Sequence, residues 1–190
     1  MLSYANIQPP FTLKFREMPK KELEAYRAWF HEIVSERIAE LRKAVQGTRG
    51  FENWEPDETP ESLDHLGEWF LQQVETRKRT DEEVGEIKAR LSFPIDIPDE
   101  ELTNRSFSLA MDIGMYFGRV VLKNLSGTRW DQALKNKNFA DYGQPVIMGF
   151  GTVPLNPVRI AVTLAYAFAA KEQPGTRLRA LYEVWSKKRK

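Results

Sequence analysis

Apolar residues recur at helical spacing through the first half of the chain. In residues 19–46 they repeat every three or four positions and then stop at a glycine, which predicts a long amphipathic helix. A shorter apolar stripe predicts a second helix that begins at Thr59. A third helix is expected from Thr80, because Thr80 and Glu83 have the spacing of a capping box. Residues 1–91 are therefore predicted to form a helical N-terminal region.

Residues 103–124 carry apolar side chains on most faces of a helix, so we expect them to form the central, most buried helix. Gly114 and Gly118 lie one helical turn apart within it, and their missing Cβ atoms permit close approach of another element. The same spacing dimerises membrane helices, but Asp112 and Arg119 argue against that environment. We therefore predict close packing of these glycines against another helix or strand.

Beyond residue 127 the pattern changes from helical spacing to alternation. Apolar and polar residues alternate over 128–134, and a second run follows over 145–150, which together predict a β-hairpin. Asn156 followed by a proline is typical of a helix start, and this helix is expected to end near residue 170. A last helix is predicted over 176–187.

Two further segments are predicted to be extended. Phe11, Leu13 and Phe15 alternate with polar residues, which is typical of a short strand that joins the sheet. Residues 92–98 contain prolines that interrupt a similar alternation, so we interpret residues 92–102 as an extended connector, with an edge strand over 92–98 as the alternative.

These elements predict an α+β fold, mostly helical, with a small antiparallel sheet built around the hairpin of the C-terminal half. The length suits one domain over residues 1–190. We expect it to consist of a helical region over residues 1–91, a connector over residues 92–102 and a helix–hairpin–helix region over residues 103–190.

The composition narrows the possible chemistry. The 28 Lys and Arg residues nearly balance the 27 Asp and Glu residues, so a nucleic-acid partner is disfavoured. The lack of cysteine excludes disulfides, thiolate catalysis and Cys-type metal sites. Only two histidines occur, on separate predicted helices, so we expect no metal and no cofactor. No motif indicates a nucleophile paired with histidine, and an enzyme is therefore disfavoured, although carboxylate catalysis stays open.

The location of the protein is predicted from what the sequence lacks. The first residues have neither the cationic nor the apolar segment of a signal peptide. The most apolar stretch, 158–170, is too short to span a bilayer and contains Arg159. Together with the absence of cysteine, these features predict a cytoplasmic protein that does not enter membranes.

The stretch 51–68 is the best candidate for a functional surface, because it carries seven carboxylates and no Lys or Arg. Trp54 lies within it, and a tryptophan in such a loop either covers the edge of the core or anchors an interface. The candidate partner-binding residues are Glu52, Trp54, Glu55, Asp57, Glu58, Glu61 and, on the predicted hairpin, Trp130. A solvated acidic loop with one packed tryptophan is the alternative interpretation.

The chain also resembles an uncharacterised family of small bacterial cytoplasmic proteins. The runs 15–20, 108–124 and 143–151 carry this resemblance, together with Trp130 and the triplet Leu155-Asn156-Pro157. The order of a glycine-containing helix, a tryptophan strand and an Asn-Pro helix is similar to small domains among bacterial toxin-immunity proteins.

This resemblance implies a non-catalytic binding protein, namely an immunity protein that neutralises a basic toxin, and it supplies no catalytic residues. The alternative function is an enzyme or small-molecule-binding protein that uses carboxylates and aromatic side chains near the hairpin and Trp130.

Overall fold

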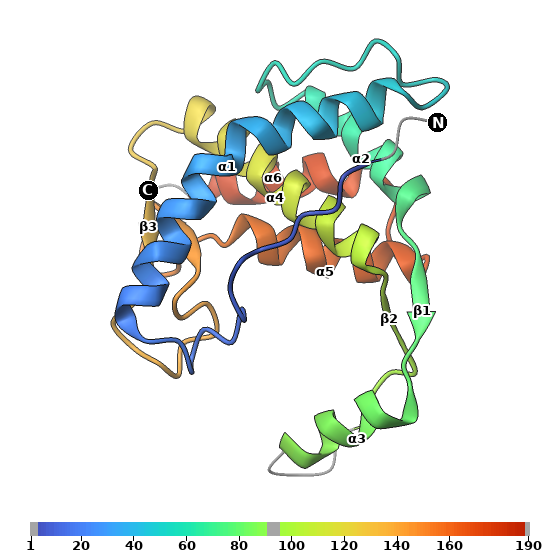
Figure 1. Cartoon of the computed structure of the whole chain (residues 1–190). Coiled ribbons are helices and arrows are strands. Elements are labelled where there is room, and N and C mark those ends of the chain that lie inside the picture. Colours follow the sequence, from blue (N-terminus) through green and yellow to red (C-terminus); the bar gives the residue numbers. More distant parts are fainter. Residues whose placement is uncertain (1–3, 91–95, 189–190) are drawn as a thin grey trace.

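The computed structural model describes residues 4–90 and 96–188 and shows a mostly helical chain with two small antiparallel ribbons (Figure 1). The elements in chain order are α1 (Lys20–Gln46), α2 (Ser62–Gln73), β1 (Thr76–Lys78), α3 (Asp81–Arg90), β2 (Glu100–Leu102), α4 (Asn104–Asn124), β3 (Arg129–Gln132), β4 (Pro145–Met148), α5 (Pro157–Ala169) and α6 (Arg177–Lys187). β1 pairs with β2 and β3 pairs with β4. The predicted α+β class, with helices predominating, is confirmed.

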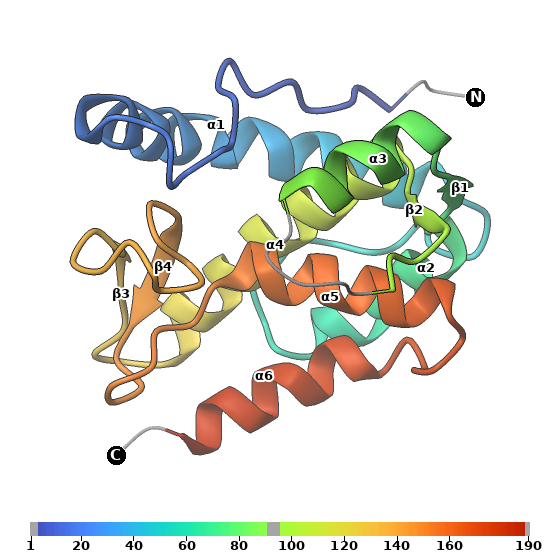
Figure 2. The same ribbon diagram turned by 90° about the horizontal axis from the view of Figure 1, so that it is seen from below.

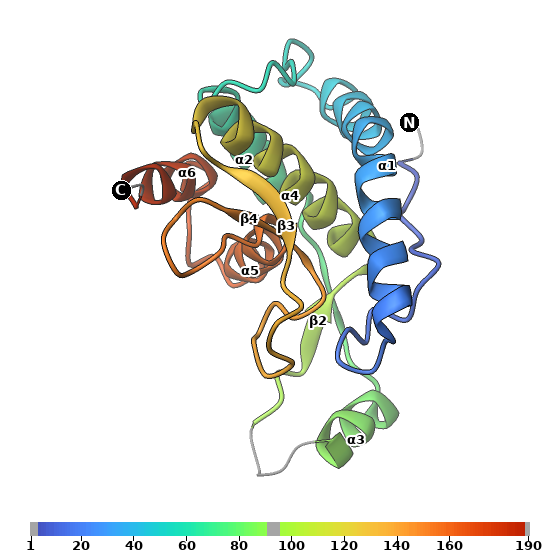
Figure 3. The same ribbon diagram turned by 90° about the vertical axis from the view of Figure 1, so that its left-hand side faces the viewer.

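α4 is the centre of the fold. It lies between α1 on one side and α5 on the other, while α2 packs against α4, α5 and α6 (Figure 3). Ile113, Tyr116 and Phe117 are fully buried in the core that α4 shares with α2, α5 and α6. Met115 belongs to a second buried cluster, formed against α1. The prediction that 103–124 is the most buried helix is confirmed, with Thr103 as its N-cap.

The two glycines of α4 permit two close contacts. A Cβ atom on Gly114 would lie 2.6 Å from the Cα of Val158 in α5, and one on Gly118 would lie 2.8 Å from the indole of Trp130. The predicted close packing of both glycines is therefore confirmed. In the two described ranges, no helix combines the length and the apolarity that crossing a membrane requires.

The predicted hairpin is present, with Trp130 of β3 opposite Ile147 of β4. Ile147 also forms an antiparallel bridge with Leu155, which brings the chain directly to the start of α5. There the side chain of Asn156 accepts a hydrogen bond from the backbone N–H of Arg159 at 3.0 Å, so the predicted helix cap is confirmed.

The prediction of a strand at Phe11–Phe15 was wrong. Leu13 has a φ of 58°, in the left-handed region, and a tight turn begins at Lys14. The alternating aromatic residues face α1 instead of a strand, since the rings of Phe11 and Phe15 lie 5.4 and 5.0 Å from the ring of Tyr26. Ring packing therefore explains the pattern that suggested a strand.

β1 and β2 form a ribbon that carries α3 away from α4 (Figures 1 and 3). The predicted capping box of α3 is confirmed, because Thr80 and Glu83 each accept a hydrogen bond from the other's backbone N–H. The ribbon itself was missed, because β2 occupies the end of the segment interpreted as a connector. Residues 91–95 of the helix end and connector lie outside the described residues.

A buried ion pair joins α1 to α4. The guanidinium of Arg37 donates two hydrogen bonds of 2.8 Å to the carboxylate of Asp112, whose side chain is fully buried. The hydroxyl of Tyr4 also donates to Asp112, which ties the N-terminal segment to both helices. Burial raises the pKa of Asp112, although both partners stabilise its charged form.

Candidate functional site

Trp54, the central residue of the predicted acidic surface, points into the protein. Its side chain is 3 % exposed, its Nε1 donates a 2.9 Å hydrogen bond to the carbonyl of Ser62, and its ring packs at 5.4 Å on the ring of Tyr116. Of the two interpretations of this tryptophan, the structure matches the one in which it covers the edge of the core.

Some acidic residues of this loop pair with arginines from neighbouring elements. Three carboxylates form ion pairs with arginines: Glu55 with Arg42, Glu58 with Arg119 and Glu61 with Arg179. Asp57 accepts hydrogen bonds from Thr59, which lower the pKa of its carboxyl. Glu52 accepts a hydrogen bond from the backbone N–H of Gly50. The loop therefore has less uncompensated negative charge than its sequence suggests, although Glu52 and Asp57 are bonded only to neutral groups.

Trp130 is half-buried at the junction of β3 with α1 and α4. Its ring lies 5.5 Å from those of Phe30 and His31, and it covers Gly118. Burial and the nearby Arg27 lower the pKa of His31. In the part of the chain that the structure describes, Trp130 therefore belongs to an aromatic cluster with α1, and its ring contacts do not include the acidic loop.

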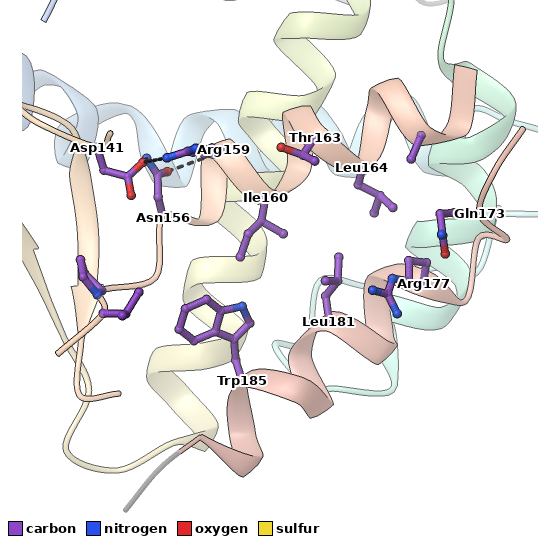
Figure 4. A pocket seen from close by; sticks show the side chains of 13 residues that line it. Asp141, Asn156, Arg159, Ile160, Thr163, Leu164, Gln173, Arg177, Leu181 and Trp185 are labelled. Carbon is purple, nitrogen blue, oxygen red and sulfur yellow. Dashed lines mark hydrogen bonds and ion pairs between the residues drawn. The ribbon is translucent and has the colours of Figure 1, made fainter. Parts of the chain in front are cut away.

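The sequence did not predict the pocket that lies between α5 and α6, with a volume of about 410 Å³ (Figure 4). The two helices lie side by side, joined by a short connection (Figure 2). On α6 the pocket is lined by Arg177, Leu181 and Trp185, which are spaced four residues apart and so form one stripe. The stripe spans about 12 Å along the helix at 1.5 Å per residue.

The facing wall comes from α5 and the loop before it. Ile160 and Leu164 form its apolar part, and Thr163, an exposed residue, lies beside them (Figure 4). The Asn156 cap fixes where α5 begins and therefore which helix face meets α6. The pocket thus has an apolar middle between polar ends.

One polar end of the pocket is an internally satisfied network. Arg159 donates a 3.1 Å hydrogen bond to the carboxylate of Asp141, which is buried, and the amide of Asn156 donates to the same oxygen at 3.0 Å. Asn156 also donates to Gln144. The charges of Arg159 and Asp141 therefore largely compensate each other.

The other polar end is not satisfied. Within the described residues, neither the guanidinium of Arg177 nor the side-chain amide of Gln173 has a hydrogen-bond or ion-pair partner. Figure 4 shows Arg177 and Arg159 at opposite ends, with Leu181 between them. An arginine that faces a pocket without a carboxylate partner is suited to hold an anionic group.

Trp185 completes the apolar wall near the Arg159 end. Its ring is half-buried and packs at 5.0 Å on Phe150, while the ammonium of Lys188 lies 4.4 Å from the ring centre. The indole is therefore fixed from one direction and presents contact area to the pocket. The nearby ammonium adds a second positive charge close to this site.

The pocket offers binding groups more clearly than acid–base or metal chemistry. The described residues that line it include one carboxylate, already held by Arg159 and Asn156, and no histidine. Nowhere in residues 4–90 and 96–188 do three His, Cys, Asp or Glu side chains gather as a metal site would require.

Sequence reasoning missed this pocket because its walls come from different elements. The stripe of Arg177, Leu181 and Trp185 was a usable signal, since a charged and two apolar residues share one helix face. Which element the stripe faces is decided by tertiary packing. Comparison of the chain with protein-family models, with curated proteins and with solved structures gives no match. The resemblance to immunity-type domains therefore stays a prediction.

Proposed function

We propose that this protein is a non-catalytic binding protein whose ligand is a small organic anion with an apolar body. The observation that carries the proposal is Arg177, a guanidinium without a partner among the described residues, at one end of an apolar pocket. The proposal shares with the predicted alternative function only the binding of a small molecule, because the pocket depends on Arg177 and is not lined by Trp130. The pocket volume of about 410 Å³ lies within the range of small-molecule sites.

The pocket suggests how such a ligand is oriented. A carboxylate or sulfonate pairs with the two parallel N–H groups of Arg177, and Gln173 supplies a further donor. The apolar body lies between Leu164 and Leu181 and extends to the indole of Trp185. A planar aromatic body suits this end because aromatic rings pack favourably edge to face.

The test is a fluorescence titration with 8-anilino-1-naphthalenesulfonate, an aromatic sulfonate. Saturable binding with one site per chain is expected. Arg177→Met should weaken it about tenfold or more, because a charge-assisted hydrogen-bonded pair is lost. Arg177→Lys should bind with intermediate affinity, since the charge remains but the paired donors do not.

The matched control is Lys187→Met, which removes an exposed positive charge from the same helix at a position that does not line the pocket. Its affinity should equal that of the unmodified protein. Thr163→Trp should block the pocket by volume and weaken binding without any change in charge. Equal affinity for Arg177→Met and Lys187→Met would exclude Arg177 as the anion-binding group and refute the proposal.

A toxin-neutralising role at the acidic loop is the second candidate function. The observation that favours it is that Glu52, Glu55, Asp57 and Glu61 are exposed on one ordered loop. Surface acids of this kind increase the rate of association with a basic protein. If a basic partner is captured, charge reversal of Glu52 and Asp57 should slow its association at low salt, while unchanged rates would exclude the loop.

The lack of cysteine fits a reducing compartment such as the cytoplasm.

A further inference from the structure

A second pocket, of about 430 Å³, lies on another face of α5. Its walls are the N-terminal segment around residues 6–15, the first turns of α4 and the face of α5 that carries Val158 and Val162. Figure 1 shows the N-terminal segment crossing in front of α4. Val162 lines this pocket and Thr163 lines the α5–α6 pocket, so α5 is a wall shared by two separate cavities.

The described residues that line the second pocket carry no formal charge at neutral pH. The phenol of Tyr26 stays protonated, because burial raises its pKa above the usual value. The α5–α6 pocket, by contrast, has two arginines and a carboxylate. An ion that entered the second pocket would lose its hydration without gaining a charged partner, which is unfavourable. The lining therefore selects for uncharged ligands.

Hydrogen-bonding groups are nevertheless present at this pocket. Asn6, Gln8 and Asn104 are exposed at its rim, and within the described chain their side-chain amides have no protein partner. Each amide can both donate and accept a hydrogen bond. They suit a neutral carbonyl, hydroxyl or amide on a ligand whose remaining surface is apolar. The apolar contacts available include Met111, which is buried, and Phe107, which is 37 % exposed.

The N-terminal wall of the pocket is held at both ends, and in its middle by the ring of Phe11, which packs on Tyr26 of α1. At one end the backbone N–H of Ile7 donates a 3.1 Å hydrogen bond to the hydroxyl of Ser108. At the other end Phe15 packs on Tyr26. Among the described contacts, the backbone of residues 8–13 makes no hydrogen bond to another element. Ring packing of Phe11 is therefore what holds this stretch between its ends.

We infer that the second pocket binds a small, uncharged, mainly apolar molecule that has one neutral hydrogen-bonding group. The inference rests on the cavity, its uncharged lining and its unpaired amides. It does not depend on the proposed anion site, because Arg177 and Gln173 line only the α5–α6 pocket, although Asn156 lines both pockets. Together with the proposed anion site, this pocket gives the protein two sites for chemically distinct ligands.

The test uses N-phenyl-1-naphthylamine, which has the ring system of 8-anilino-1-naphthalenesulfonate without its sulfonate. Both probes are titrated against two variants of neighbouring residues, Val162→Trp and Thr163→Trp. Val162→Trp should weaken the neutral probe about tenfold or more and leave the sulfonate unchanged. Thr163→Trp should do the reverse. The two proposals can therefore be tested separately. The neutral probe and Val162→Trp test the second pocket, and the sulfonate and Thr163→Trp test the anion site.

Two further measurements protect the test from a folding defect in Val162→Trp. Phe107→Asp places a charge on an exposed residue at the pocket and should also weaken the neutral probe about tenfold. In the unmodified protein, the probe should shift the backbone amide signals of Ile7, Ser108 and Met111 in NMR spectra. The inference is overturned if the neutral probe does not saturate, if both variants bind it normally, or if the shifted signals belong to the α5–α6 pocket.

Discussion

Gly114 of α4 lies directly against the backbone of Val158 in α5: a Cβ atom on Gly114 would be 2.6 Å from the Cα of Val158. Gly118 differs, because its added Cβ would meet the indole of Trp130, a side chain that can shift. We therefore expect Gly114→Ala to lower the free energy of unfolding more than Gly118→Ala does. The cost for Gly114→Ala should be about 1–3 kcal/mol or more, measured by urea unfolding.

A matched control for these variants is Gly85→Ala in α3, where an added Cβ meets no atom within 4 Å. It should be neutral or slightly stabilising, because alanine favours a helix over glycine by about 1 kcal/mol. Combining Gly118→Ala with Trp130→Leu should recover stability, whereas the same change should not rescue Gly114→Ala. If Gly114→Ala and Gly118→Ala lower the free energy of unfolding equally, contact with the backbone is not what distinguishes the two sites.

The second prediction concerns the ion pair of Arg37 and Asp112. Asp112→Asn or Arg37→Met should lower the free energy of unfolding by about 3–5 kcal/mol, because each leaves a buried polar group without its partner. The double variant Arg37→Met/Asp112→Leu should recover part of this loss, since neither charge remains. Arg42→Met is the control, because its pair with Glu55 is exposed and is worth about 0–1 kcal/mol.

The third prediction is a pH dependence that arises from His31. Burial and Arg27 lower the pKa of this imidazole in the folded protein below its usual value of 6.5. The unfolded chain therefore binds the proton more readily than the folded chain, so protonation favours unfolding. The stability contributed by neutral His31 is complete above pH 6.5 and is lost as the pH falls through the lower pKa of the folded state.

Thermal unfolding between about pH 7.5 and about pH 5 checks this prediction. The melting temperature of the unmodified protein should fall more steeply than that of His31→Asn. His65→Asn changes the other histidine, which is exposed on α2, and should keep the dependence of the unmodified protein. Parallel curves for His31→Asn and the unmodified protein would contradict the proposed role of His31.

The elements of the fold that local sequence determines were predictable. The Thr80–Glu83 capping box and the Asn156 cap depend on residues three positions apart, so their sequence spacing predicts their geometry. α4 was recognisable because a helix that is apolar on most faces has to be buried. The β1–β2 ribbon was missed because its strands are short and polar, without the alternation by which strands are recognised.

The candidate site shows which functional features the sequence could not predict. The sequence drew attention to the acidic loop, since its carboxylates lie close together in sequence. It did not indicate Arg42, Arg119 and Arg179, which come from other elements and pair with three of them. Conversely, the sequence did not predict Arg177 as a binding residue. Its role depends on the absence of a nearby carboxylate among the described residues. Both properties depend on tertiary contacts between residues distant in sequence.

The last prediction separates structural from binding roles within the acidic loop. Trp54→Ala should lower the free energy of unfolding by about 3–5 kcal/mol, because a large side chain leaves the core next to Tyr116 and the hydrogen bond to Ser62 is lost. Glu52→Lys, on an exposed residue two positions earlier, should change it by no more than about 0.5 kcal/mol. Urea unfolding of the two variants measures both values.

Trp54→Phe shows which portion of the tryptophan matters. Phenylalanine keeps an aromatic ring against Tyr116 but has no N–H to donate to Ser62. Trp54→Phe should therefore lower the free energy of unfolding, but by less than Trp54→Ala does. A melting curve of Trp54→Ala that matches the unmodified protein would mean that the indole does not support the core. The tryptophan would then be available as an interface anchor, which is one of the two interpretations that the sequence left open. A large loss of unfolding free energy in Trp54→Ala would instead mean that the indole supports the core. Any contact with a partner would then be made by the exposed carboxylates around it.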